Sequence, residues 1–313
     1  MAVAVNQPNA AVSSRLALVL TTALAPAAWG TTYIVTTELL PPDRPLLAGL
    51  VRALPAGLAL AAVSHQRPIG GWWIKTLVLG TLNIGGFFAL LFVAAYRLPG
   101  GIAAILGAVQ PLAAAGLAAL LLHERLRLYV ITAGLLGVVG VSLLVLRAEA
   151  HLDAFGVVAG LGGAASMAIG VVLTKHWGRP VKLLTFTAWQ LVAGGAVLLP
   201  LVAAIEGWPT QITVVNIGGY LWLAVVGTAI AYTLWFRGIE QLPVAQVTLL
   251  GLASPVVAAA AGWIILKQAL TPPQMAGVTL VLAAIWLGQH TKPETAATQP
   301  QHPGFRPHIS PRS

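Results

Sequence analysis

Long apolar runs separated by short polar breaks fill almost the whole chain. Runs of about twenty residues with few charges are typical of transmembrane helices, and the breaks between them are too short to hold a soluble domain. The pattern therefore predicts an all-α integral membrane protein with ten transmembrane helices. The predicted spans are Leu16–Thr37, Leu46–Val63, Thr76–Tyr96, Ile102–Leu122, Leu128–Leu146, Phe155–Thr174, Leu183–Ile205, Gly218–Phe236, Val244–Leu266 and Gln274–Gly288.

Composition supports this fold class and excludes several functions. Hydrophobic residues make up 58% of the chain and charged residues only 8%, against about 25% charged in an average soluble domain. The 17 Lys and Arg residues outnumber the 8 acids, but they stand singly between apolar runs, so we expect no nucleic-acid partner. The absence of cysteine excludes disulfides and thiolate chemistry.

The distribution of Lys and Arg predicts how the chain is oriented. Twelve of them fall at the N-terminus, in the even-numbered loops and in the C-terminal tail, and four fall in the odd-numbered loops. The positive-inside rule then places both termini in the cytoplasm of a multi-pass protein of the cell (inner) membrane. The first run also resembles a signal peptide, with Ala25-Pro26-Ala27 as an A-x-A site, but it continues to Thr37, which favours an uncleaved span.

The two halves of the chain resemble one another. The Leu-Pro pair at 98–99 matches the pair at 242–243, and Pro111 matches Pro255, both with an offset of 144. Arg52 meets Gln190 at an offset of 138, and one six-residue insertion in the loop around Glu206–Ile217 reconciles the two registers. Because each half holds five spans, an odd number, the second half threads the membrane in the opposite direction.

We therefore predict two inverted five-helix repeats and two terminal segments. These are an N-terminal cytoplasmic segment at 1–14, a first repeat at 15–147, a second repeat at 148–290 and a disordered, Pro-rich tail at 291–313.

Short motifs in this order resemble the EamA family of the drug/metabolite transporter superfamily. They are Trp29-Gly30-Thr31, Arg52, Pro111 with His123-Glu124-Arg125-Leu126, and Leu270-Thr271 with Gln274 and Gly277. The chain departs from the family at Lys267-Gln268, where an acidic residue is common. The resemblance covers residues from about 15 to 290 and extends to amino-acid exporters of the YddG type. It implies that spans one to four and six to nine enclose a cavity, with spans five and ten at the periphery.

Polar side chains inside the spans are the candidates for substrate binding, because such groups must face protein or a water-filled cavity. Arg52 lies roughly 9 Å from the outer end of span two, where it either attracts a substrate carboxylate or snorkels outward to Asp43 or Glu38. Its repeat partner Gln190 and the polar Asn83 can hydrogen-bond a substrate.

Gln110 and Ser254 each precede a proline in the middle of a span. A proline frees a backbone carbonyl and kinks the helix, which suits a binding site near the midplane; interhelical hydrogen bonds are the competing explanation. Trp29, Tyr33, Trp189 and Tyr232 lie deeper than the other aromatic residues, and their rings would suit an aromatic or aliphatic substrate.

No acidic residue is predicted at mid-membrane. We therefore expect transport without carboxylate-mediated proton coupling, and no cofactor or metal.

The leading prediction is an exporter of small metabolites, chiefly aromatic or neutral amino acids, working by alternating access in the lipid bilayer as a monomer or a homodimer. A transporter of another small solute, such as a drug or a nucleotide sugar, is the first alternative. A membrane enzyme acting on lipid-linked substrate is the second, but the histidines and acids form no catalytic cluster within the spans, so we expect no enzyme.

Overall fold

The computed structural model describes residues 8–98, 102–145 and 153–289, and within these ranges every regular element is a helix. The predicted tail at 291–313 and the first seven residues lie outside the described part. The helices are α1 (Pro8–Gly30), α2 (Thr32–Leu39), α3 (Pro45–Ser64), α4 (Trp72–Gly80), η1 (Thr81–Gly85), α5 (Gly86–Arg97), α6 (Ile102–Gly107), α7 (Gln110–Leu121), α8 (Leu128–Val145), α9 (Ala154–Trp177), α10 (Leu183–Leu201), η2 (Val202–Glu206), α11 (Val214–Ala224), η3 (Val225–Ile230), α12 (Ala231–Gln241), α13 (Val244–Leu250), α14 (Ala253–Ile265) and α15 (Pro272–Gln289).

Nine helical segments of the described chain are long and apolar enough to cross a membrane. They correspond to the first nine predicted spans; the eighth, Val214–Gln241, extends beyond its predicted range at both ends. The tenth predicted span is the 18-residue helix α15. It is not one of the nine, because prolines and glutamines at its two ends make it more polar. A tenth membrane crossing thus stays a prediction.

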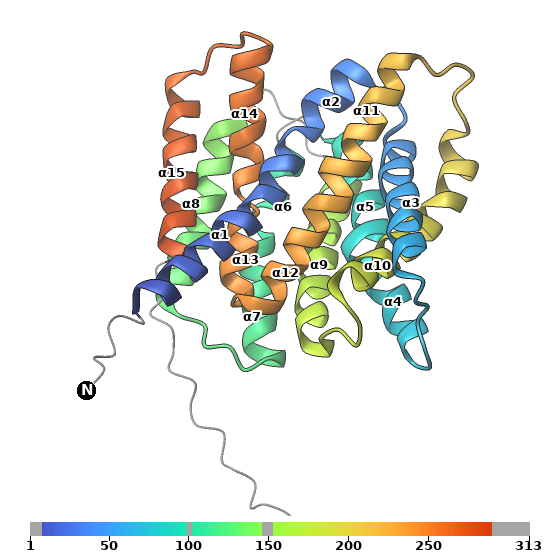
Figure 1. The fold of residues 1–313 in the computed structure, drawn as a ribbon. Coiled ribbons are helices and arrows are strands. Elements are labelled where there is room, and N and C mark those ends of the chain that lie inside the picture. The colour runs from blue at the N-terminus through green and yellow to red at the C-terminus, as the bar shows by residue number, and fades with distance from the viewer. Residues whose placement is uncertain (1–7, 99–101, 146–152, 290–313) are drawn as a thin grey trace, which may run out of the picture.

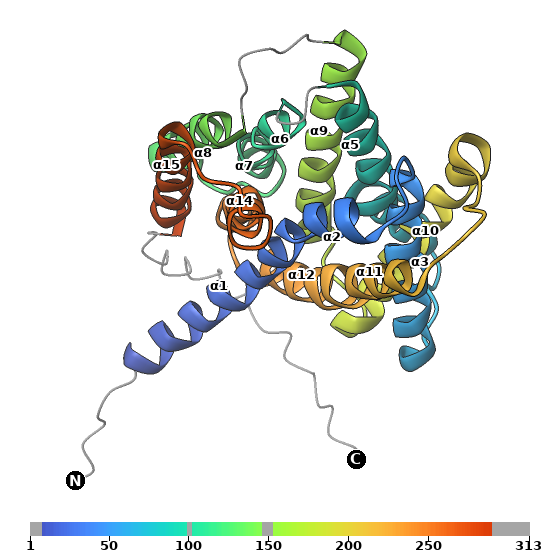
Figure 2. The same ribbon diagram turned by 90° about the horizontal axis from the view of Figure 1, so that it is seen from above.

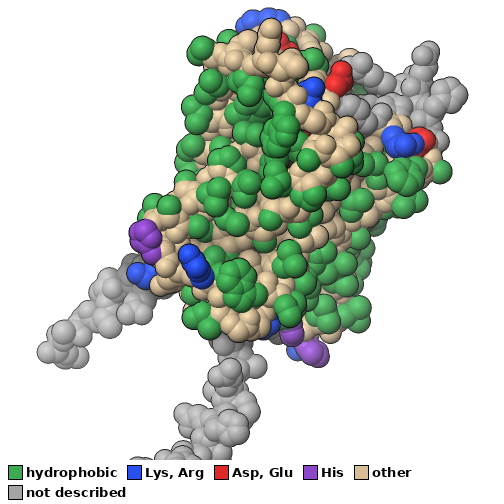
Figure 3. All heavy atoms as spheres, turned by 90° about the vertical axis from the view of Figure 1, so that its right-hand side faces the viewer, with side chains coloured by type: hydrophobic (Ala, Val, Ile, Leu, Met, Phe, Trp, Pro, Cys, Tyr) green, Lys and Arg blue, Asp and Glu red, His purple; other side chains and the backbone are tan. Residues whose placement is uncertain are grey.

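The helices stand side by side in one bundle (Figure 1). Hydrophobic side chains spread over the middle of the face drawn in Figure 3, and charged side chains lie toward its two ends. This distribution is the one that a bilayer requires, since charged groups are costly in hydrocarbon.

We name the two ends of the bundle by a residue of each. The Glu124 face carries the loops at 65–71, 122–127, 178–182 and 242–243, and the Glu206 face carries the loops at 40–44, 207–213 and 266–271. The positive-inside rule predicts that the Glu124 face is cytoplasmic.

Helix boundaries recur along the chain at the offsets found in the sequence. Helices α8 and α15 are both 18 residues long and lie 144 positions apart at both ends. The π-helical segments η1 and η3, each in the middle of a span, also begin 144 positions apart. The breaks between α6 and α7 and between α13 and α14 follow Gly107 and Leu250, close to the same offset. The two halves therefore share these irregularities as well as their helices, although the break between α1 and α2 and the segment η2 have no counterpart in the other half.

Helix packing also pairs equivalent elements. Helix α3 packs along α10, and α8 packs along α15. Helices α8 and α15 together form one edge of the bundle (Figure 2). Helix α1 packs on α12 and α14, just as α9 packs on α5 and α7. The peripheral position of α8 and α15 is the one that the family resemblance implies for spans five and ten.

Two glycines allow the close contact between α3 and α10. A Cβ atom at Gly57 would lie 2.7 Å from the backbone nitrogen of Val192, and one at Gly195 would lie 2.7 Å from Cβ of Leu54. These distances are shorter than van der Waals contact, so neither position tolerates a side chain without movement of the backbone. Small residues are what allow helices to approach closely in a membrane.

We predict that Gly57→Val destabilises the protein by about 1–3 kcal/mol, because the added side chain overpacks the interface of α3 and α10. The measurement is thermal denaturation of the detergent-solubilised protein, followed by size-exclusion chromatography. Gly218→Val is the matched control, since a Cβ atom at Gly218 meets no atom within 4 Å. Equal stability of the two variants would contradict this account of the interface.

Candidate functional site

Arg52 is held inside the bundle by the π-helical segment of span eight. It lies in α3 and is only 5% exposed. Its Nε donates a hydrogen bond to the hydroxyl of Thr228 at 2.9 Å, and Nη2 donates to the carbonyl of Gly227 at 2.6 Å. The guanidinium carbon lies 5.1 Å from the ring centre of Phe88. Its partners are thus two neutral acceptors and an aromatic face.

This geometry differs from one of the two predicted arrangements. The donors of Arg52 that make hydrogen bonds point across the bundle to η3, rather than outward to Asp43 or Glu38. Within the described residues no carboxylate forms an ion pair with Arg52. A buried cation with only neutral partners is costly in a medium of low dielectric constant, so this position favours a bound anion.

An aromatic cluster contacts the same carbonyl through Trp29. Trp29 of α1 donates from Nε1 to the carbonyl of Gly227 at 3.0 Å. The ring of Trp29 lies 5.2 Å from that of Tyr232 and 5.1 Å from that of Trp235. The Gly227 carbonyl thereby accepts from both Arg52 and Trp29. A π-helical turn contains one extra residue and disrupts the regular backbone ladder, which explains how this carbonyl can serve two side chains.

A second polar cluster occupies the equivalent position in the other half. Asn83, in η1, donates from Nδ2 to Oε1 of Gln190 at 2.8 Å and to the hydroxyl of Thr174 at 3.0 Å. Both Asn83 and Gln190 are fully buried. The phenol of Tyr232 donates to the backbone carbonyl of Asn83 at 3.3 Å. Tyr232 therefore connects this cluster to the cluster around Arg52 and Trp29.

The two clusters are related by the repeat. Arg52 and Gln190 are equivalent at the offset of 138, and Gly227 and Asn83 are equivalent at the offset of 144. In one cluster, therefore, a polar side chain of span two contacts the π-helical segment of span eight. In the other, a polar side chain of span seven contacts the π-helical segment of span three, so both contacts cross between the halves. The geometry is shared, but one half contributes a cation and the other an uncharged amide.

Gln110 and Ser254 lie at the breaks of spans four and nine, as predicted. Gln110 begins α7, and its buried Nε2 has no hydrogen-bond partner. Ser254 lies in α14, where it is partly exposed. Within the described residues no hydrogen bond joins either residue to the Arg52 cluster.

Trp189 lies in a different environment from the other deep aromatic residues. It is buried, but Nε1 donates to the carbonyl of Gln66 at 2.9 Å in a loop of the Glu124 face. Its neighbours are Leu79 and Phe186. The structure thus brings together Arg52, Trp29, Tyr232, Asn83 and Gln190, but not Trp189. The side chain of Tyr33 is outside the described part.

Sequence reasoning missed the acceptors of this site. Gly227 and Thr228 look unremarkable in an apolar run, and Gly227 carries no side chain chemistry at all. The signal available was the repeat: Gly227 is the equivalent of Asn83, which was already a candidate. A Cβ atom at Gly227 would lie 3.1 Å from Nη2 of Arg52, so a glycine here makes room for the guanidinium.

Comparison with known proteins identifies the family. The EamA-like transporter family matches residues 16–146 and again residues 154–288. The chain belongs to this family. It is 46% identical over 267 residues to Protein PecM of Dickeya dadantii, which covers 85% of this chain and 90% of that protein. It is 28% identical over 277 residues to the probable amino-acid metabolite efflux pump of Salmonella typhimurium, covering 83% and 90% respectively.

A solved crystal structure supports the fold. It superposes with a TM-score of 0.73 at 19% sequence identity and covers 87% of this chain and 97% of that one. The protein is therefore a multi-pass membrane protein of the EamA-like transporter family with an all-helical membrane fold. The site described above lies in a transporter.

We predict that Thr228→Val destabilises the protein by about 1–3 kcal/mol, because it leaves the buried Nε of Arg52 without its acceptor. Thermal denaturation in detergent measures the effect. Thr233→Val is the control on the same span, since the hydroxyl of Thr233 only donates to the carbonyl of Ala229 in its own helix. If the two variants melt alike, the hydrogen bond of Arg52 to Thr228 contributes nothing to stability.

Proposed function

We propose that this transporter exports small metabolites, chiefly aromatic or neutral amino acids, across the inner membrane. In this proposal the two inverted repeats, 15–147 and 148–290, move by alternating access around a central site, with both termini in the cytoplasm. The substrate and the surrounding lipid are its partners, and it acts as a monomer or a homodimer. The observation that carries the proposal is the buried Arg52, whose partners among the described residues are neutral.

Arg52 serves as the anion-binding group of the site. Its hydrogen bonds within the described residues engage Nε and Nη2, which leaves Nη1 to donate to a substrate carboxylate. Charge-assisted hydrogen bonds of this kind are about twice as strong as neutral ones. Because the guanidinium is already fixed by Gly227 and Thr228, it need not be reorganised when the substrate binds.

The remaining candidate residues supply apolar area and neutral hydrogen bonds. Trp29 and Tyr232 form an aromatic wall next to Arg52. Gln110 adds a buried amide nitrogen that lacks a partner, and Ser254 adds a partly exposed hydroxyl. In our proposal Asn83 and Gln190 complete the polar lining, and Tyr33 and Trp189 are further aromatic candidates. An anionic group beside apolar rings fits an amino acid with an aromatic or aliphatic side chain.

The relatives support export without identifying the solute. The Salmonella relative is named as a probable amino-acid metabolite efflux pump. A different small solute, such as a drug or a nucleotide sugar, is the alternative within transport. A phosphorylated solute would favour several cations, whereas Arg52 is the one buried Lys or Arg among the described residues. A membrane enzyme is disfavoured, because the described residues hold no group of three or more acids and histidines that could bind a metal.

We predict that Arg52→Gln raises the KM for a transported amino acid by about tenfold or more, since it removes a charge-assisted hydrogen bond. The measurement is saturable uptake of labelled amino acids into liposomes that contain the purified protein. Arg237→Gln, at an exposed position on α12, controls for the change in charge. A folded Arg52→Gln protein with unchanged KM would exclude Arg52 from the site.

We also predict that an imposed pH gradient alone does not drive accumulation in these liposomes. The described acids, such as Asp153, Glu206 and Glu240, lie at the ends of helices or in the loops, so none of the described carboxylates lies at mid-membrane to carry a coupled proton. Uptake against a gradient that a pH difference drives, and that a proton ionophore abolishes, would contradict uncoupled transport.

A further inference from the structure

Spans four and nine, the two spans with a central break, meet at one end of the bundle and separate at the other. On the side of the Glu124 face, α7 packs against α13. On the side of the Glu206 face, α6 packs on α5, α8 and α9, whereas α14 packs on α1, α2, α8 and α15. The two spans therefore diverge toward the Glu206 face.

Burial changes along span nine in the same way. Six of the seven residues of α13 are buried, but none of the residues of α14 is. Helix α14 is thus more exposed than α13, in agreement with the separation of spans four and nine toward the Glu206 face.

The closed end holds an ion pair between the two halves of the chain. The carboxylate of Glu124, after α7, lies 2.9 Å from Nζ of Lys175, near the end of α9. The other carboxylate oxygen accepts a hydrogen bond at 3.0 Å from the backbone nitrogen of Val244, the first residue of α13. Lys175 in turn donates to the carbonyl of Leu242. One carboxylate therefore joins span four to spans six and nine.

The equivalent positions at the other end carry no charge. Glu124 corresponds to Gln268 at the offset of 144, and Lys175 corresponds to Thr37 at the offset of 138. The same pair thus cannot form at the Glu206 face.

The Glu206 face has its own contacts between the halves, but on other spans: Arg97 pairs with Asp153 at 3.6 Å between spans three and six, and the carboxylate of Glu206 accepts from the backbone of span two. Among the described residues, spans four and nine are linked through a charged side chain only at the Glu124 face, and this asymmetry is the physical reason for a preferred conformation.

We propose that Glu124 and Lys175 form a lock that holds the Glu124 face closed and biases the resting transporter toward the state open at the Glu206 face. The proposal rests on the proposed function, since it assigns a state to the alternating-access cycle. Opening the Glu124 face requires that spans four and nine separate there, and this breaks the contacts of Glu124 with Lys175 and Val244. A substrate moves the equilibrium only by its difference in affinity between the two states.

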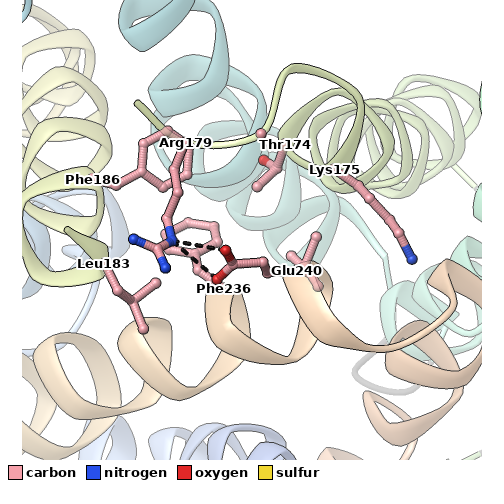
Figure 4. Close-up of a pocket in the computed structure, with 9 residues that line it drawn as sticks. Thr174, Lys175, Arg179, Leu183, Phe186, Phe236 and Glu240 are labelled. Carbon is pink, nitrogen blue, oxygen red and sulfur yellow. Dashed lines mark hydrogen bonds and ion pairs between the residues drawn. The ribbon is translucent and has the colours of Figure 1, made fainter. Parts of the chain in front are cut away.

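A neighbouring ion pair provides a matched control. Arg179 and Glu240 lie on the same face at 2.9 Å, but both belong to the second half of the chain. This pair lies in a pocket lined by residues of α9, α10, α12 and the loop at 178–182, and Figure 4 shows Arg179 bonded to Glu240 there, with Lys175 pointing away from the pair. Breaking it removes the same kind of charge without releasing one half from the other.

The test measures the distance between the two halves at the Glu124 face. Because the chain contains no cysteine, Leu121→Cys and Gln241→Cys create the two labelling sites for spin labels. Both positions are exposed and stand at the ends of α7 and α12. Double electron–electron resonance in lipid nanodiscs then reports how often the face is open, and no substrate is needed.

We predict a single short distance in this protein and a second, longer distance after Glu124→Gln, with the ratio of open to closed molecules raised by about threefold to fivefold. Lys175→Gln has the same effect, and Glu240→Gln leaves the distribution unchanged. If Glu124→Gln and Lys175→Gln give the same distance distribution as the labelled protein that retains Glu124 and Lys175, the proposed lock does not exist. If the lock opens as predicted but no solute is transported, it is the proposed function that fails instead.

Discussion

The structure depends on one constraint: polar groups within a bilayer must find their partners inside the protein. Arg52 meets this constraint by crossing to the π-helical segment η3, and the amide oxygen of Gln190 meets it by accepting from Asn83 in η1. Each π-helical segment offers polar groups that a regular apolar helix withholds. The irregular turns are therefore the places where side chains from the opposite half of the chain can be held.

The same constraint makes the two halves geometrically alike but chemically different. Their helices, the central breaks of spans four and nine and the π-helical segments η1 and η3 recur at nearly fixed offsets. Arg52 faces a glycine carbonyl, however, whereas its equivalent Gln190 faces an asparagine amide. At the Glu124 face an ion pair joins the halves, and at the opposite positions stand Gln268 and Thr37. In our proposal, the symmetric backbone allows two states, and the unequal side chains determine which solute binds and which state is preferred.

Hydropathy predicted much of the helical framework from the sequence, because length and apolarity alone define a span. The matching offsets also anticipated that Arg52 and Gln190 would occupy related positions. What could not be predicted was the pairing across the bundle. The π-helical segments have no strong sequence signal, and the acceptor of Arg52 is the backbone of Gly227. Similarly, Trp189 looked as deep as Trp29, but a loop carbonyl at Gln66 holds it at the Glu124 face. Depth along one span does not determine which neighbour lies beside it.

In our proposal, a substrate carboxylate binds at Arg52 between the two halves. A cryo-electron microscopy structure of the protein with a transported amino acid bound tests it most directly. We predict the carboxylate at about 3 Å from Nη1 of Arg52, with the side chain of the amino acid against Trp29 and Tyr232. A bound amino acid elsewhere in the bundle, with Arg52 still bonded only to Gly227 and Thr228, would contradict it.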